Sequence, residues 1–226
     1  MKKYSKRYKE AIKLLDKNKT YSLKEAISCL KKMPPPKFDS SVDLHFQLNV
    51  DPKKPEEMVR GTVVLPHGRG KAVRVAVFCK GEAEKEAKEA GADIVGAEDL
   101  INKVAGGFLD FDCAVATPEI MKELSKLGKV LGPRGLMPSP KTGTLTNDVG
   151  KAVKELKKGK VEFKVDKQGG IHLSIGKLSF DETKIYENAT KVIEAINSSR
   201  PASVKGTFIK SVSLASTMSP GLKIAL

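Results

Sequence analysis

The 226-residue sequence is poor in aromatic side chains: tryptophan is absent, and only 5% of residues are aromatic. It contains just three cysteines, Cys29, Cys79 and Cys113. An odd number of cysteines without close spacing predicts neither a disulfide framework nor a zinc site, and it fits a reducing cytoplasm. No apolar run approaches the roughly 18–20 residues of a membrane-spanning helix, so we expect no membrane partner. The basic N-terminal segment lacks the apolar core of a signal peptide, which argues against secretion.

Acidic residues are also scarce relative to basic ones. The chain has 41 Lys and Arg against 27 Asp and Glu, a formal net charge of +14. Such an excess favours a polyanionic partner, most often nucleic acid, although charge that serves only solubility is the alternative. The charge is uneven, because residues 67–160 carry a net +4 and the rest of the chain +10. With 40% hydrophobic residues, the chain is not expected to be disordered.

The two ends of the chain have the pattern of an α+β body with an antiparallel sheet. Alternating apolar residues predict strands, and apolar residues at helical spacing predict helices. The expected helices cover residues 4–15, 22–33 and 181–198, and the expected strands cover residues 42–50, 161–165, 171–175 and 207–214. The turn Gln168–Gly170 between two of these strands predicts a hairpin.

The middle of the chain alternates short apolar strands with helices, which is typical of βαβ units around a parallel sheet. The expected strands are Arg74–Phe78, Asp93–Gly96 and Cys113–Ala116, and the expected helices are Glu82–Ala90, Glu98–Ala105 and one that Thr117 caps. The sequence therefore predicts two domains. Residues 1–66 with 161–226 form a discontinuous α+β domain, and residues 67–160 form an inserted Rossmann-like domain joined through two hinge crossings.

The chemistry of an enzyme is not evident in this pattern. A dinucleotide site needs a glycine-rich turn after its first strand, yet the turn that begins at Cys79 has one glycine followed by carboxylates. His45, His67 and His172 lie in separate segments without the spacing of metal ligands. We therefore expect a protein without catalytic residues, metal or cofactor. A nucleotide-binding enzyme that uses the central domain is the alternative.

Three features indicate RNA binding. The polar faces of the outer strands offer hydrogen-bonding side chains, which suit the 2′-hydroxyls and bases of RNA, although an ordinary solvated sheet face has the same look. These side chains are His45, Gln47, Lys164, His172, Ser174, Ser213 and either Lys210 or Ser211. Phe38 is an aromatic residue in a polar loop, and residues 213–221 are small and hydroxylated. In addition to these three features, residues 128–144 in the middle of the chain form a basic loop without acidic residues.

Several motifs together resemble the L1 family of bacterial large-subunit ribosomal proteins. The segments that carry the resemblance are Leu131–Pro138 with Lys141–Thr144, Arg60–Gly68, Gly91–Asp93, Gly206–Phe208, Lys37–Asp39 and Thr217–Met218. They occur in order along essentially the whole chain. The resemblance implies a protein that binds 23S rRNA at the mobile stalk beside the E site and assists movement and release of deacylated tRNA. It further implies repression of the protein's own mRNA, and a protein that is monomeric when free.

The resemblance also assigns rRNA-binding residues. They are Lys37, Phe38, Ser41, His45, Lys164, Lys167, Ser211, Thr217, Met218, Ser219 and Pro220. The family usually has glycine at the position of Ser219, and glycine would permit a positive φ or a close approach of RNA. From the sequence we therefore expect Ser219→Gly to bind RNA as well as the native protein or better. A repressor of mRNA outside the ribosome is a further alternative.

Overall fold

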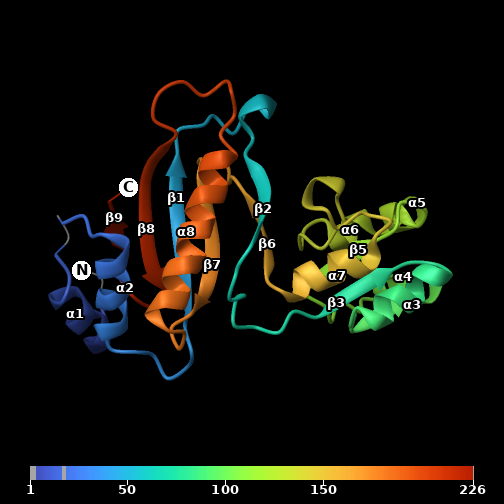
Figure 1. Ribbon diagram of the computed structural model, residues 1–226, viewed down its shortest axis with the longest axis horizontal. Helices are drawn as coiled ribbons and strands as arrows, with labels where there is room; N and C mark the ends of the chain where they lie inside the picture. The colour runs from blue at the N-terminus through green and yellow to red at the C-terminus, as the bar shows by residue number, and fades with distance from the viewer. Residues whose placement is uncertain (1–3, 17–18, 226) are drawn as a thin grey trace. The chain divides into compact units, whose positions relative to one another are not determined.

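The computed structural model describes residues 4–16 and 19–225 (Figure 1). The chain divides into two compact units, Met1–Gly70 with Val161–Leu226, and Lys71–Lys160. The predicted mixture of antiparallel and parallel sheets is confirmed, because the first unit has an antiparallel sheet and the second a parallel one. Within the described residues, no helix is both long and apolar enough to cross a membrane.

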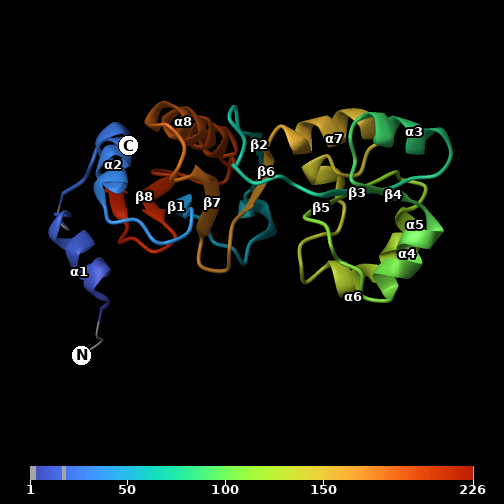
Figure 2. The same cartoon turned by 90° about the horizontal axis from the view of Figure 1, so that it is seen from below.

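The first unit is built on a four-stranded antiparallel sheet in the order β7-β1-β8-β9. Its strands are β1 (Ser41–Leu48), β7 (Gly170–Lys177), β8 (Ile209–Ser216) and β9 (Leu222–Ile224). The helices of this unit are α1 (Lys6–Lys13), α2 (Leu23–Lys32) and α8 (Glu182–Ser198), with a short 3-10 helix, η1 (Pro55–Glu57). α8 lies over one face of the sheet (Figure 2). Apolar side chains of β1 on that face, such as Leu44 and Phe46, share a core with Ile27 of α2 and Ile185 of α8.

The expected hairpin between residues 161–165 and 171–175 is wrong. β6 (Lys160–Lys164) pairs with β2 (Arg60–Val64) in a separate two-stranded sheet, whereas β7 pairs with β1. The chain still reverses there, because Asp166 accepts hydrogen bonds from the backbone N–H groups of Gln168 and Gly170. A methyl group on Gly61 of β2 would lie 2.6 Å from the ring of Phe163. Glycine at this position therefore leaves space for the Phe163 side chain of β6. Local alternation predicts a strand but not its partner.

The second unit has a parallel sheet in the order β4-β3-β5, formed by β4 (Ile94–Gly96), β3 (Val75–Phe78) and β5 (Cys113–Ala116). Helices pack on both of its faces (Figure 2). Val75 and Val77 share a core with α3 (Glu82–Glu89) and α7 (Val149–Lys157). Ala76 and Phe78 share one with α4 (Glu98–Ala105), α5 (Met121–Leu124) and α6 (Gly128–Leu131). Two 3-10 helices, η2 (Ser125–Leu127) and η3 (Pro140–Thr142), complete the unit.

Thr117 does not cap a helix as the sequence predicts. α5 begins at Met121, and residues 117–120 form a turn in which Ile120 N–H donates to the Thr117 carbonyl at 3.2 Å. The hydroxyl of Thr117 is buried without a hydrogen-bond partner among the described residues. A second bond, from Met121 N–H to the Pro118 carbonyl at 3.3 Å, continues the turn, and i to i+4 bonding begins only with Leu124 N–H and the Ile120 carbonyl. Helix α7 and strands β2 and β9 are elements that the sequence prediction omits.

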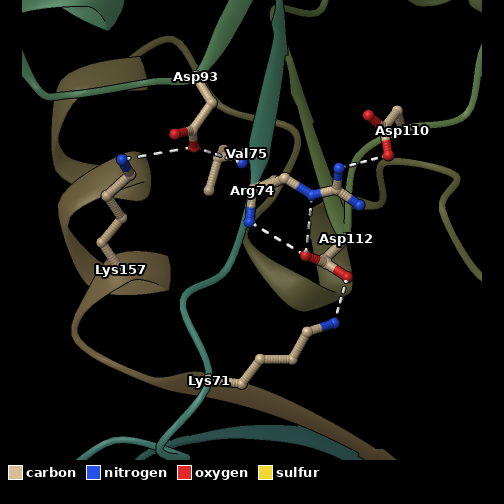
Figure 3. A network of polar contacts seen from close by, with 7 residues as sticks. All are labelled: Lys71, Arg74, Val75, Asp93, Asp110, Asp112 and Lys157. Atoms are coloured by element: carbon tan, nitrogen blue, oxygen red, sulfur yellow. Dashed lines mark hydrogen bonds and ion pairs between the residues drawn. The ribbon is translucent and has the colours of Figure 1, made fainter.

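A polar network fixes the amino end of β3 in the second unit (Figure 3). Asp112 accepts from Lys71 Nζ at 2.8 Å and from the backbone N–H of Arg74 at 3.1 Å. Asp93 accepts from the backbone N–H of Val75 at 2.9 Å and lies 3.4 Å from Lys157 Nζ. The Lys71 contact lowers the pKa of Asp112, and the Val75 N–H lowers the pKa of Asp93. The network therefore holds the segment that enters this unit and the end of α7 at the amino-terminal end of the strands.

Candidate nucleic-acid interface

The face of the four-stranded sheet opposite its apolar core is polar, and we call it the open face. Side chains alternate between the two faces of a strand. Because the apolar residues of β1 and β8 are buried in the core, the residues between them lie on the open face. Strand register brings these neighbours into rows across the sheet. The open face consists of Asp43, His45 and Gln47 on β1, His172 and Ser174 on β7, Ser211, Ser213 and Ala215 on β8, and Lys223 on β9.

Two histidines meet at the centre of the open face. His45 lies directly opposite His172 in the β1–β7 register, and their Nδ1 atoms are 2.9 Å apart. The rings meet edge to face, with their centroids 5.1 Å apart. Partial burial, followed by the neighbouring His172, lowers the pKa of His45, and the carboxylate of Asp43 opposes this shift. His45 is therefore a titratable group at the centre of the face.

The turn between β6 and β7 borders the histidine pair. Asp166 Oδ2 lies 3.5 Å from His172 Nε2. Hydrogen bonds from the backbone N–H of Gly170 and then of Gln168 lower the pKa of Asp166. Gln47 donates through Nε2 to the carbonyl of Gln168 at 3.0 Å, so the turn is also tied to β1. Asp166 consequently stays ionised beside His172 at neutral pH.

Hydroxyl groups and lysine define one end of the open face, where β1 begins and β8 ends. The backbone N–H of Ser41 donates to Thr217 Oγ1 at 3.1 Å, and the N–H of Thr217 donates to the Ser41 carbonyl at 3.1 Å. Lys177 Nζ donates to Ser41 Oγ at 3.0 Å. Phe38 and Met218, beside this end in sequence, are 53% and 52% exposed. Two large apolar side chains are thus left to the solvent next to a polar rim, which suits contact with nucleobases.

Ser219 closes the turn that presents Thr217 and Met218. Its Oγ accepts from the backbone N–H of Ser216 at 2.8 Å, and its own N–H donates to the Ser216 carbonyl at 3.0 Å. Among the described residues, only glycines have a positive φ, so Ser219 needs no left-handed backbone. A serine therefore fits this position without strain and contributes a hydrogen bond that glycine cannot make.

The structure places the sequence-predicted residues in one unit. Ser41, His45 and Ser211 lie on the four-stranded sheet, Lys37 and Phe38 precede β1, and the segment Thr217–Pro220 follows β8. Ser211 and Lys210 are both exposed, because the register shifts between Gln47 and Leu48. Because of this bulge, the two alternatives that the sequence offers at this point, Lys210 and Ser211, are both accessible to a ligand.

Lys164 and Lys167 lie outside the four-stranded sheet, on β6 and in the turn that borders the histidine pair. Lys164 ends β6, Lys167 lies in the following turn, and both side chains are exposed. They line a shallow groove of about 470 Å³ together with Pro52, Met58, Val165 and Asp166. Sequence reasoning missed Met58, Lys177 and Lys223. Of these three residues, only Lys223 lies in a pattern that indicates an exposed strand position, because it stands between the apolar residues Leu222 and Ile224.

The basic loop of the second unit is held by internal hydrogen bonds. Thr144 Oγ1 accepts from the backbone N–H of Ser139 at 2.9 Å and lies 2.8 Å from Thr142 Oγ1. Arg134 and Lys141 are exposed on this loop. The hydrogen bonds hold the backbone of residues 139–144, and the side chains of Arg134 and Lys141 remain accessible to an anion.

Nucleophilic and metal chemistry finds little support in the described part of the chain. No group of three or more His, Cys, Asp or Glu residues there is arranged to hold a metal ion. Cys79 is buried, and this burial raises the pKa of its thiol to about 11. A thiol with such a pKa is protonated at neutral pH and is a poor nucleophile.

The comparisons with known proteins identify the class to which this fold and face belong. The sequence profile of the "Ribosomal protein L1p/L10e family" matches residues 30–220, and the chain belongs to this family. The chain is similar to the large ribosomal subunit protein uL1 of Fervidobacterium nodosum, with 56% identity over 227 residues, covering 100% of this chain and 97% of the relative. The uL1 proteins of Thermosipho melanesiensis and Thermosipho africanus are 54% and 55% identical over 225 residues, covering 99% of this chain and 97% of each relative.

Proposed function

We propose that this protein is a structural constituent of the large ribosomal subunit that binds 23S rRNA through the open face. Membership of a ribosomal protein family places it in the ribosome, in the cytoplasm of a bacterium. The observation that carries the rRNA proposal is the polar face bounded at one end by exposed Phe38 and Met218. The proposed role is binding without catalysis.

The chemistry of the open face supports RNA as its ligand. Hydroxyl, imidazole and amide groups form hydrogen bonds to 2′-hydroxyls and base edges, and an exposed aromatic ring stacks on an unpaired base. We infer that residues 1–66 with 161–226 form the rRNA-binding domain and that residues 67–160 form an inserted Rossmann-like domain. The proposed contacts are Lys37, Phe38, Ser41, His45, Lys164, Lys167, Ser211, Thr217, Met218, Ser219 and Pro220.

The family resemblance supports a more specific role. We propose that the rRNA site is the mobile stalk beside the E site, where the protein assists movement and release of deacylated tRNA. We also propose that it represses translation of its own mRNA by binding an RNA structure that mimics the rRNA site. Competition between the mRNA leader and a stalk fragment for one site would test the second role, and simultaneous binding of both would contradict it.

Phe38 provides a direct test of the rRNA proposal. Stacking of a base on an aromatic side chain contributes about 1–3 kcal/mol, so Phe38→Ala should weaken binding to a 23S rRNA stalk fragment by roughly 5- to 150-fold. Phe108 is 39% exposed in the other unit, and Phe108→Ala is the matched control that should bind normally. Filter binding measures both affinities. Equal affinity of the Phe38 variant and the native protein would contradict the proposed face.

Two other classes of function predict different results. A nucleotide-binding enzyme that uses the second unit should bind ATP, GTP or NAD in an equilibrium screen. A repressor that acts only outside the ribosome should be missing from purified large subunits after sedimentation. Stable occupancy of large subunits together with no nucleotide binding is the result that our proposal requires.

A further inference from the structure

The contact between His45 and His172 restricts the protons that the two rings carry. A neutral imidazole has one N–H donor and one bare nitrogen acceptor. Since the two Nδ1 atoms are 2.9 Å apart, one ring donates its Nδ1–H and the other accepts it. The donor ring then has a bare Nε2, and the acceptor ring carries its proton on Nε2.

Asp166 determines which ring is the donor. Its carboxylate lies 3.5 Å from Nε2 of His172, which favours a proton on that nitrogen. His172 is then the acceptor at Nδ1, and His45 is the donor. Consequently, in the neutral pair, Nε2 of His45 is a bare acceptor, and no hydrogen bond or ion pair at this atom occurs among the described contacts. It cannot donate a hydrogen bond to a phosphate oxygen in that state.

We propose that His45 and His172 form a phosphate subsite that takes up one proton when it binds an RNA backbone phosphate. The proton comes from solution and adds to Nε2 of His45, which becomes a charge-assisted donor to the phosphate oxygen. His172 is the positioning residue, because its bare Nδ1 holds the Nδ1–H of His45. This inference rests on the proposed rRNA-binding function and specifies how one part of the face works.

The charged groups around the two histidines are consistent with uptake of a proton when the phosphate binds. Asp43 lies next along the open face of β1, and Asp166 precedes β7. On the other side, Lys210 of β8 and Lys223 of β9 are exposed, and Ser213 between His45 and Lys223 is uncharged. In the free protein, burial and the facing ring keep His45 neutral at pH 7. A phosphate at Nε2 adds the negative charge that makes protonation favourable.

The test is isothermal titration calorimetry of the full chain with a 23S rRNA stalk fragment. Titrations at pH 6.5–7.5 in two buffers with different ionisation enthalpies give the number of protons taken up. We expect uptake that approaches one proton per complex. Affinity should therefore rise as pH falls, by up to about tenfold per pH unit across the window between the free and bound pKa values of His45.

Three variants distinguish the pair from other titrating groups. His45→Gln and His172→Gln should each abolish most of the proton uptake and flatten the pH dependence. His67→Gln is the matched control, because His67 pairs with Glu187 away from the open face and its loss should leave the uptake unchanged. Circular dichroism checks that each variant folds. His172 is exposed at the surface, so its variant keeps the test valid if His45→Gln unfolds.

The outcomes separate this inference from the proposed function. Tight RNA binding without proton uptake would overturn the phosphate subsite, and a 2′-hydroxyl donating to the bare Nε2 would then explain a contact at His45. Uptake that persists in both histidine variants would also overturn it. Failure to bind the rRNA fragment at any pH would instead contradict the proposed function itself.

Discussion

At the scale of single residues, Ser219 changes an expectation that rests on sequence alone. The glycine that is usual in the family predicts that Ser219→Gly binds RNA at least as well as the native protein. In the structure, the Ser219 hydroxyl accepts the Ser216 N–H at 2.8 Å and closes the turn that carries Thr217 and Met218. Glycine would remove this hydrogen bond and leave the backbone freer before RNA binds. The contact therefore favours the opposite result.

We expect Ser219→Ala and Ser219→Gly to weaken binding to the rRNA fragment by about 2- to 13-fold, since a typical hydrogen bond contributes roughly 0.5–1.5 kcal/mol. The glycine variant should be the weaker of the two. Ser219→Thr retains a hydroxyl and is the control that should stay close to the native affinity. Affinity and melting temperature are measured on the same samples. Native affinity in both the alanine and glycine variants would show that the turn needs no such bond.

At the scale of elements, β2 and β6 meet in a close contact between one glycine and one aromatic ring. Gly61 lies under Phe163, whose side chain is only 2% exposed, and a methyl group there would come within 2.6 Å of the ring. A buried ring has few alternative positions, because protein interiors are closely packed. The close fit therefore favours glycine at position 61.

We expect Gly61→Ala to destabilise the first unit by about 1–3 kcal/mol, the usual effect of overpacking. The double variant Gly61→Ala with Phe163→Leu should be more stable than the sum of the two single changes predicts, because the smaller side chain makes room for the methyl group. Urea unfolding of all four proteins provides the cycle. Additive effects in the double variant would mean that the two residues do not compete for space.

At the scale of the whole molecule, charge and binding surface are divided unequally along the chain. Residues 67–160 carry a net +4 and the remainder +10, and the open face belongs entirely to the first unit. Phosphate neutralisation supplies much of the affinity of a protein for RNA. The first unit is therefore expected to carry most of it.

Replacement of residues 71–160 by a short Gly/Ser linker should leave specific rRNA affinity within about tenfold of the native value, or ~1.4 kcal/mol. The logarithm of affinity should fall with the logarithm of salt concentration for both proteins, because bound counterions are released. Circular dichroism controls for folding of the shortened chain. A thousandfold loss in a folded protein would place the main contacts in the second unit.

Local sequence was sufficient for most of the secondary structure. Apolar alternation at Val42, Leu44 and Phe46 predicts a strand with one buried face, and the structure has that strand. The prediction of α4 over Glu98–Ala105 agrees with the structure residue for residue. The helix start predicted at Thr117 was wrong, because the hydroxyl of this threonine is buried in a turn instead of capping α5.

The sequence by itself determined the polar character of the open face, the family and the charge distribution, since these depend on residue type and order. Only the tertiary structure decided which strands are neighbours. It brought His45 and His172 together across 127 residues and Ser41 and Thr217 across 176. Long-range register depends on how whole strands and helices pack into a common core, and no local period contains that information. For this reason the sequence predicts His45 as an RNA contact, whereas the contact between its ring and that of His172 is evident only in the tertiary structure.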